Sequence, residues 1–373
     1  MGGDKSMADR STESPVVSVV LPLYNAEETI ERAIESIRKQ TFTAWELLVL
    51  DDGSTDRSPQ IAQVVAGRDP RVTVTRLEQS GLIATLNRGL KDSNAEYVAR
   101  MDQDDVSLPH RLEKQVAFLE QNPGVAVVGG AAQVVDAHGS LNQERRPPCS
   151  PTEVARALAE RSAIIHPTVL MRRGAVDQVG GYRTPFLAAE DYDLWLRLSE
   201  RYKLANIPEI VLRYSAGGSQ LSVIQAEQQI LSTVGAQLCH QRRLHCEKDP
   251  SANSSEVVSR DWLIRNGMDE CTIDDIVVSK LADRSWWLAE SGLLNEAEVL
   301  AHGIQEVKVS PSRTKSRRFL SLWSLGRAAR KRRQIRRVAV LLFQAALTSP
   351  RGVAERLFFG GLRKFRSRSS GES

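Results

Sequence analysis

Apolar runs of strand length alternate strictly with segments of helical spacing from residue 16 to about residue 101. The first run, residues 16–21, is almost continuously apolar, which is typical of a strand covered on both faces of a parallel sheet. Strict alternation of this kind predicts an α/β fold with an open, mostly parallel sheet, flanking helices and right-handed crossovers. We expect strands at residues 16–21, 46–50, 72–77 and 97–101, and helices at residues 26–40, 58–66 and 82–90.

Polar clusters follow three of these strands. They are PLYN at residues 22–25, DDGS at residues 51–54 and DQDD at residues 102–105. Ligands of open α/β sheets bind beyond the carboxyl ends of the strands, so we expect a site where these clusters meet. The chain has no GxGxxG and no GxxxxGK(S/T) sequence, which argues against a dinucleotide fold and against a P-loop.

The third cluster gathers three carboxylates into four residues. Asp102 and Asp104 should point the same way, because side chains alternate along an extended chain, while Asp105 turns aside. Like charges this close raise one another's pKa unless a cation lies between them. Mg²⁺ and Mn²⁺ prefer hard oxygen ligands and take up substrate phosphates, so the cluster favours a metal site. The alternative is an acidic turn before the helix that starts near residue 108.

Further along the chain the pattern is less regular. A helix is expected at residues 111–121 and another at 152–160, with a strand from residue 125. Residues 164–170 have the composition of a strand, and residues 189–198 have helical spacing. Beyond about residue 220 the pattern is helical with loops, and no chemistry can be attached to it.

The distribution of charge divides the chain more sharply than its net charge of +4. The chain has 50 basic and 46 acidic residues, and 17 of the basic but only two of the acidic ones lie from Pro311 onward. This leaves 33 basic and 44 acidic residues before Pro311. The body is therefore acidic, and the tail is strongly basic. Basic clusters in the tail adjoin Trp323 and an apolar run that begins at Val338 and is too short to span a membrane. This pattern favours a helix on an anionic membrane surface, or else a solvated tail that attracts nucleic acid without specificity.

Cysteine usage and the N-terminus bear on location. The four cysteines form no CxxC pair and no metal-ligand spacing, which indicates reduced thiols and a cytoplasmic setting. Residues 1–15 are polar and lack an apolar core, so we expect a disordered lead-in and neither a signal peptide nor a membrane span. The expected location is cytoplasmic, peripheral on the inner face of the cell membrane.

Five motifs in order carry a resemblance to a known family. They are VSVVLPLYNAEETIERAIESI, WELLVLDDGSTD, LIATLNRGL, RMDQDDVSLPHRLEKQ and GGYRTPFLAAEDYDLWLRL. Together they resemble the inverting family 2 glycosyltransferases with a GT-A fold, of the kind found in bacterial polysaccharide or lipopolysaccharide assembly. The resemblance covers residues 16–221. We therefore divide the chain into a lead-in at 1–15, a GT-A domain at 16–221, a helical extension at 222–310 and a basic amphipathic tail at 311–373.

The resemblance implies a donor site for a nucleotide-diphosphate sugar, most often a UDP-sugar. Asp52 matches the family aspartate that hydrogen-bonds the base, which suits a carboxylate because it accepts an imide N–H. Asn87 and Arg88 are placed to reach the ribose or the diphosphate, although Arg88 could equally be a surface residue. Residues that resemble the first nucleotide-binding loop and the opening of its helix are Pro22, Tyr24, Asn25 and Glu27.

The resemblance also assigns the metal and the chemistry. Asp102 and Asp104 fit the family's DxD motif, which holds Mn²⁺ or Mg²⁺ on the donor diphosphate, and Asp102 is also expected to contact the donor. Asp191 fits the general base that takes the acceptor hydroxyl proton, with Glu190 as its partner. Both acids could instead stabilise a helix N-terminus. His166 and Trp195 are expected to be structural, the tryptophan in the core.

Two other functions remain open at this stage. A nucleotidyltransferase also uses strand-end carboxylates and a metal, but it would need a Gly-rich basic loop where this chain has PLYN. A non-catalytic nucleotide-sugar-binding protein is the second alternative, although the chain carries Asp52, Asp102, Asp104 and Asp191 together. The expected partners are a nucleotide sugar and a glycan or lipid-linked acceptor, with no specific nucleic acid.

Overall fold

The structure is a computed structural model that describes residues 14–135, 143–215, 223–290 and 294–307, together with positions 309, 317, 320–325, 341 and 345. Most of the expected lead-in and of the basic tail at 311–373 lies outside these residues. The chain divides into two compact units. The first comprises Met1–Gly218 and Ala236–Glu256, and the second Ser219–Gly235 and Val257–Ser373.

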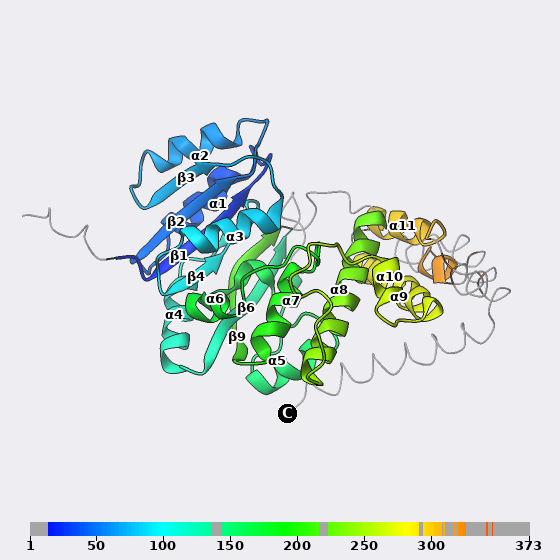
Figure 1. Ribbon diagram of the computed structural model, residues 1–373. Coiled ribbons are helices and arrows are strands. Elements are labelled where there is room, and N and C mark those ends of the chain that lie inside the picture. Colours follow the sequence, from blue (N-terminus) through cyan, green and yellow to red (C-terminus); the bar gives the residue numbers. More distant parts are fainter. Residues whose placement is uncertain are drawn as a thin grey trace, which may run out of the picture. The chain divides into compact units, whose positions relative to one another are not determined.

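A single mixed sheet forms the centre of the first unit (Figure 1). In the part of the chain that the structure describes, it runs in the order β3-β2-β1-β4-β8-β6-β9-β5, with β7 paired to β6. Neighbours from β3 to β4 are parallel, β6 and β9 are parallel, and the remaining pairs are antiparallel. The strands are β1 Val17–Leu23, β2 Trp45–Asp51, β3 Val72–Arg76, β4 Tyr97–Arg100, β5 Val106–Ser107, β6 Val125–Val135, β7 Gln143–Arg145, β8 Leu170–Arg172 and β9 Lys203–Ser215.

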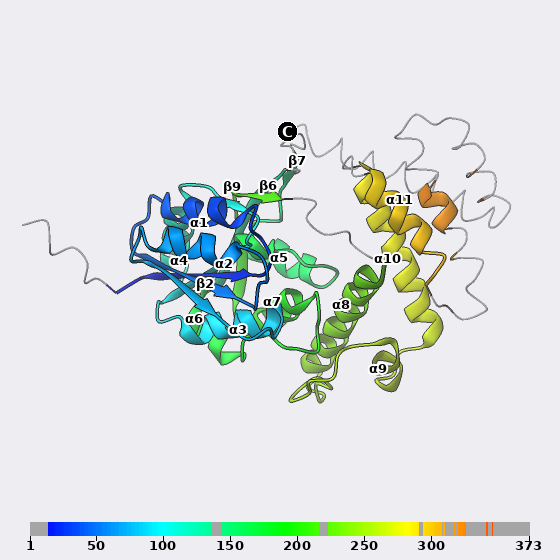
Figure 2. The same ribbon diagram turned by 90° about the horizontal axis from the view of Figure 1, so that it is seen from above.

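Helices cover both faces of the sheet. Figure 2 shows α1, α2 and α4 on one side, and α3 and α6 on the other. The expected open α/β sheet with flanking helices is thereby confirmed, and the predicted helix at residues 58–66 has the same bounds as α2. The helices of this unit are α1 Ile30–Arg38, α2 Ser58–Ala66, α3 Leu82–Asp92, α4 Arg111–Gln121, α5 Pro151–Leu158, α6 Arg173–Gln178 and α7 Glu190–Ser199.

The two faces are packed differently. On the α1 side, Ile30, Ile34 and Ile37 are fully buried in one apolar cluster with alternate residues of β1. Each such side chain contributes about 1.5–3 kcal/mol when it leaves water. On the α3 side, Gly89 lies so close to Val20 that an added Cβ would come within 2.4 Å of a methyl carbon. Helix α3, which carries Asn87 and Arg88, therefore lies directly on the sheet.

One expected strand is wrong. We expected a strand at residues 164–170, but His166–Thr168 form a 3₁₀ turn. The short strand β8 begins only at Leu170. The amide and hydroxyl of Thr168 both donate to the carbonyl of Ile165, at 2.9 and 2.7 Å. Pro167 suits the first turn of a helix because it has no N–H to lose. The composition indicated a strand, but these local hydrogen bonds close a turn.

The second unit is helical, as the pattern beyond residue 220 predicted. Its helices are α9 Arg260–Arg265, α10 Glu270–Glu290 and α11 Leu294–Gly303, and it shares α8 Val223–Leu244 with the first unit. Ser259 caps α9 by accepting from the amide of Trp262 at 3.2 Å. Arg260 pairs with Glu227 and Asp274 within the unit. No described helix has the length and hydropathy that a membrane crossing requires.

Candidate active site

The loop after β1 is fastened to the loop after β2. Asn25 adopts a left-handed backbone with φ 47°, and its side-chain oxygen accepts from the amide of Thr55 at 2.8 Å. Its own amide donates to Ser54 Oγ at 3.0 Å. Glu27 accepts from the amide and guanidinium of Arg57 at 3.1 and 3.2 Å. Asn25 and Glu27 therefore shape these two loops with their side chains.

The loop after β1 is also fastened to the aspartate cluster. The amide group of Gln103 exchanges two hydrogen bonds with the backbone of Tyr24, at 2.7 and 3.1 Å. The ring of Tyr24 stays exposed, as does part of Pro22 at the end of β1. Gln103 lies between the two predicted metal ligands, and this role could not be predicted from the sequence.

Asp52 binds the start of α3. One carboxylate oxygen accepts from the amide of Ser80 at 2.7 Å, and the other accepts from the amide of Gly81 at 2.9 Å. An acid here is favourable because the first amides of a helix have no partner within the helix. A carboxylate has further lone pairs, so the bond to a base remains compatible with this position. The neighbouring Asp51 is fully buried and accepts from the amide of Ser54 at 2.9 Å.

The three aspartates after β4 form a cluster. Within the described residues, Asp102, Asp104 and Asp105 make up the only group of three or more acidic, histidine or cysteine side chains close enough to share a metal, with ligand atoms within 4.8 Å of one another. Ser215 at the end of β9 donates its amide to Asp105 at 2.9 Å and its hydroxyl to the carbonyl of Asp104 at 2.5 Å. The exposed Arg32 of α1 donates to the same carbonyl at 2.8 Å.

The electrostatics of this cluster fit a divalent cation. Burial, together with the charges of Asp102 and Asp104, raises the pKa of Asp105 to about 8. Burial and Asp102 also raise the pKa of Asp104. One oxygen of Asp105 is buried and has no hydrogen-bond partner among the described residues. A bound cation would reduce the repulsion between the carboxylates and would give the unpaired oxygen of Asp105 a partner.

A buried arginine adjoins the cluster. Arg100, at the end of β4, is 5% exposed and forms an ion pair with Asp102. Burial opposes its charge, but Asp102 and Asp105 outweigh burial and raise the pKa of Arg100. Arg111 of α4 supports the same turn and donates to the carbonyl of Arg100 at 2.8 Å. Arg100 stands two residues before Asp102, and nothing in the sequence indicates that it is buried.

Glu190 and Asp191 are the first two residues of α7. Glu190 is buried, whereas Asp191 is partly accessible and accepts from the amide of Tyr192 at 2.7 Å. Burial and then Asp191 raise the pKa of Glu190 to about 7, and burial raises the pKa of Asp191. Arg100 acts in the opposite direction on both carboxylates. The charge of Arg100 therefore acts on the predicted metal ligands and also on the predicted general base Asp191 and its partner Glu190.

Asn87 and Arg88 have partners within the protein. The side chain of Asn87 donates to the carbonyl of Tyr182 and accepts from its amide, both at 2.9 Å. Arg88 forms an exposed ion pair with Asp92 at 2.6 Å, one turn along α3. The side chain of Asn87 thus binds the GGYR segment. Arg88 lies on the surface, which was the alternative expectation for this residue. Trp195 is fully buried, as expected of a core residue.

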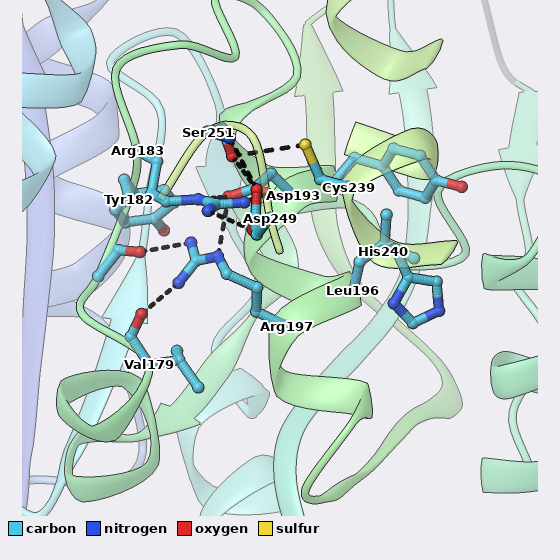
Figure 3. A network of polar contacts seen from close by, with 12 residues as sticks. Val179, Tyr182, Arg183, Asp193, Leu196, Arg197, Cys239, His240, Asp249 and Ser251 are labelled. Atoms are coloured by element: carbon cyan, nitrogen blue, oxygen red, sulfur yellow. Dashed lines mark hydrogen bonds and ion pairs between the residues drawn. The ribbon is translucent and has the colours of Figure 1, made fainter. Parts of the chain in front are cut away.

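A polar network connects α7 to the GGYR segment and to the loop after α8 (Figure 3). Arg183 forms ion pairs with Asp193 of α7 and, at 3.0 Å, with Asp249 of the loop after α8. Arg197 donates to Asp193 at 2.9 Å and to the carbonyl of Gly181 at 2.6 Å. Residues beyond 221, where the sequence indicated an extension, thus support the helix that carries the predicted base.

Comparison with known proteins agrees with this architecture. The family model described as "Glycosyl transferase family 2" matches residues 18–180. The putative glycosyltransferase EpsE of Bacillus subtilis is 38% identical over 190 residues, which cover 50% of this chain and 67% of that protein. The amylovoran biosynthesis glycosyltransferase AmsE of Erwinia amylovora is 34% identical over 209 residues, 55% of this chain and 78% of that protein.

A more distant relative and a solved structure extend the comparison. The Escherichia coli UDP-Glc:alpha-D-GlcNAc-diphosphoundecaprenol beta-1,3-glucosyltransferase WfgD is 28% identical over 211 residues, 56% of this chain and 79% of that protein. The S. aureus TarS 1-349 structure in complex with UDP-GlcNAc has a TM-score of 0.52 and 18% identity, and the match covers 92% of each chain. The chain belongs to the family 2 glycosyltransferases, and its fold is the GT-A fold.

Proposed function

We propose that this enzyme moves a sugar, with inversion and in a metal-dependent manner, from a UDP-sugar to a hydroxyl of a glycan or lipid-linked acceptor in cell-surface polysaccharide synthesis. The observation that supports this most is the presence of two groups of carboxylates. The aspartates at 102–105 are suited to bind a cation, and Glu190 with Asp191 is suited to accept a proton. Arg100 interacts with both groups. The names of AmsE and WfgD, which refer to polysaccharide biosynthesis and to a UDP-glucose donor, support the donor and acceptor classes.

In the proposed donor site, Asp102 and Asp104 hold Mn²⁺ or Mg²⁺. The cation supplies charge neutralisation for the leaving nucleoside diphosphate. Asp52 accepts the imide N–H of the base, and the exposed ring of Tyr24 provides an apolar face beside it. Pro22, Asn25 and Glu27 shape the loop under the nucleoside. Tyr24 is held in place through Gln103, so the same turn carries the metal ligands and supports the nucleoside loop.

In the proposed reaction, Asp191 accepts the proton of the acceptor hydroxyl as its oxygen attacks the anomeric carbon. The bond from that carbon to the diphosphate oxygen breaks, and the nucleoside diphosphate leaves with the electron pair. Single displacement inverts the anomeric configuration. The partly accessible position of Asp191 suits contact with an acceptor, and its raised pKa suits a proton acceptor near neutral pH.

Product analysis tests this proposal against its rivals. The full chain is incubated with a panel of nucleotide sugars, Mn²⁺ or Mg²⁺ and lipid-linked or glycan acceptors. Release of a nucleoside diphosphate with a product of inverted anomeric configuration is expected. Pyrophosphate release would instead identify a nucleotidyltransferase. A nucleotide sugar that raises the melting temperature but is never consumed would identify a binding protein.

The basic tail supports a second proposal about location. We propose that residues 311–373 hold the enzyme at the inner, anionic face of the cell membrane, where a lipid-linked acceptor would lie. Its support is the excess of basic residues and the adjoining apolar run in the sequence.

A further inference from the structure

A buried histidine and tyrosine lie beside the carboxylate pair, and the proposed mechanism does not use them. His166 comes from the 3₁₀ turn, and Tyr182 from the GGYR segment. His166 Nε2 and the hydroxyl of Tyr182 are 2.9 Å apart, and His166 Nδ1 lies 4.0 Å from an oxygen of Glu190. All three residues are less than 10% exposed.

Other contacts fix this arrangement. The backbone of Tyr182 exchanges two hydrogen bonds with Asn87, and its ring lies 5.5 Å from the ring of His166. The imidazole also meets the edge of Trp195, with ring centroids 5.9 Å apart. Gly181 has φ 67°, and an added Cβ would come within 2.7 Å of the Asn87 side chain. The histidine ring therefore has little freedom to turn.

Burial settles the protonation of both rings. Burial raises the pKa of Tyr182, so its phenol keeps its proton. Burial and then Arg100 lower the pKa of His166 well below its usual value, so the imidazole is neutral. Among the described residues, the phenol has one hydrogen-bond partner, His166 Nε2. A buried hydroxyl needs an acceptor, so Nε2 accepts and the single ring proton is on Nδ1.

We propose that Tyr182 and His166 are positioning residues: Tyr182 holds His166 as the Nδ1–H tautomer, and this N–H faces Glu190 and favours its ionised form. This inference rests on the proposed function, in which Glu190 partners Asp191. A charged Glu190 strengthens Asp191 as a base, because a second negative charge nearby favours proton uptake. The sequence indicated a structural histidine, and the contact with Glu190 adds a role in the chemistry.

The charges around Glu190 determine in which direction its pKa changes when the N–H of His166 is lost. Asp191 on the same helix and Asp102 after β4 both oppose its ionisation, as does burial. Arg100 on β4 favours it, and the N–H of His166 from the 3₁₀ turn would add to Arg100. Loss of that N–H leaves the opposing groups in place, so the pKa of Glu190 rises. Glu190 then ionises only at higher pH, and the acidic limb of the pH profile moves upward.

The first test measures the tautomer directly in the full chain. Nitrogen chemical shifts of histidine-labelled protein distinguish Nδ1–H from Nε2–H, and the signal is assigned by its loss in His166→Phe. A neutral Nδ1–H ring between pH 6 and 8 is expected, with a mixture of tautomers in Tyr182→Phe. An Nε2–H ring or an imidazolium in the wild type would overturn the inference. This measurement needs no transfer activity, so it separates failure of the inference from failure of the proposed function.

The second test follows the pH dependence of kcat/KM. In His166→Phe the acidic limb should move upward by less than about one pH unit, because the N–H lies 4.0 Å from Glu190 and acts on its charge as a dipole without a hydrogen bond. Tyr182→Phe should move it in the same direction by less, and it covers the case in which His166→Phe fails to fold. Tyr97→Phe is the matched control, because it removes another buried hydroxyl, which contacts Arg172. An acidic limb that stays at the wild-type pH in folded His166→Phe and Tyr182→Phe would contradict the proposal.

Discussion

Asp191 has two chemically different reasons to be at the start of α7. A carboxylate at a helix N-terminus interacts favourably with the first amides, and Asp191 accepts from the amide of Tyr192. A carboxylate of raised pKa beside Glu190 is also suited to accept a proton. The two roles are compatible, and a single substitution separates their contributions.

We expect Asp191→Asn to lower kcat by about 10²–10⁴-fold, the range for loss of a positioned base. The donor KM should change little, because the interaction is made mainly in the transition state. Asparagine still suits a helix N-terminus, so the melting temperature should stay near that of the wild type. Turnover close to wild type would exclude Asp191 as the base and would make Glu190 the next residue to test.

The metal ligands are tested by nucleotide binding in place of turnover. Asp104→Ala should weaken binding of the nucleoside diphosphate in the presence of Mn²⁺ or Mg²⁺, and should leave it unchanged in chelator. Calorimetry measures both conditions on the same protein. A matched control is Asp92→Ala, which removes a half-buried aspartate that pairs with Arg88 on α3. Equal loss of affinity with and without metal would show that Asp104 acts by another route.

Residues close together in sequence could be predicted as a site, and distant partners could not. Asp102, Asp104 and Asp105 follow one strand, so alternation alone indicates that they cluster. Asn87 and Tyr182 are 95 positions apart, and nothing local to Asn87 indicates that its amide group binds a backbone. The sequence resemblance therefore indicated a donor ligand at Asn87, whereas the structure shows that its side chain binds the backbone of Tyr182.

Among the elements, the regular ones were predictable because their periodicity is local. Strand β9 and the 3₁₀ turn were not, since β9 pairs with β5 and β6 over long separations and the turn depends on the hydroxyl of Thr168. Helix α7 was predicted, but its support was not. Its Asp193 is held by Arg183, which also binds Asp249, a residue 66 positions further along the chain.

Asp249→Ala tests this support. It removes the partner of Arg183 at 3.0 Å and of Arg243 at 2.5 Å and leaves both cations partly buried. We expect a loss of about 1.5–3 kcal/mol in the free energy of unfolding, the range for hydrogen bonds to charged groups, because Arg183 keeps Asp193 and Arg243 keeps Glu200 as partners. The melting temperature should then fall by roughly 3–12 °C. Asp177→Ala is the control, because its ion pair with Arg173 is exposed and spans 3.8 Å. Equal stability of the two variants would show that the network contributes little.

On the scale of the whole molecule, the acidic body and the basic tail invite a test of location. Residues 320–325 are buried, and Ser321 donates to the carbonyl of Ala301 at 2.7 Å, so the truncation starts after them. Removal of residues 326–373 should abolish binding to anionic vesicles, because the removed segment holds 13 of the basic residues. Vesicle co-sedimentation measures binding, and neutral vesicles are the control. Circular dichroism should show that the shortened chain keeps its secondary structure. Vesicle binding that is unaffected by the truncation would place the membrane contact elsewhere.

The order in which the site is completed during synthesis follows from where its supports lie in the chain. Strands β1 to β4 and the aspartates beyond them are all present once residue 105 has been made. The contacts that hold the Glu190 end of the site need Tyr182, Asp193 and finally Asp249. At translation rates of roughly 5–20 residues per second, about 7–30 s separate these two points. A nascent chain therefore has the strands of the proposed donor site well before it can stabilise the proposed base, and the proposed membrane contact of the tail comes later still.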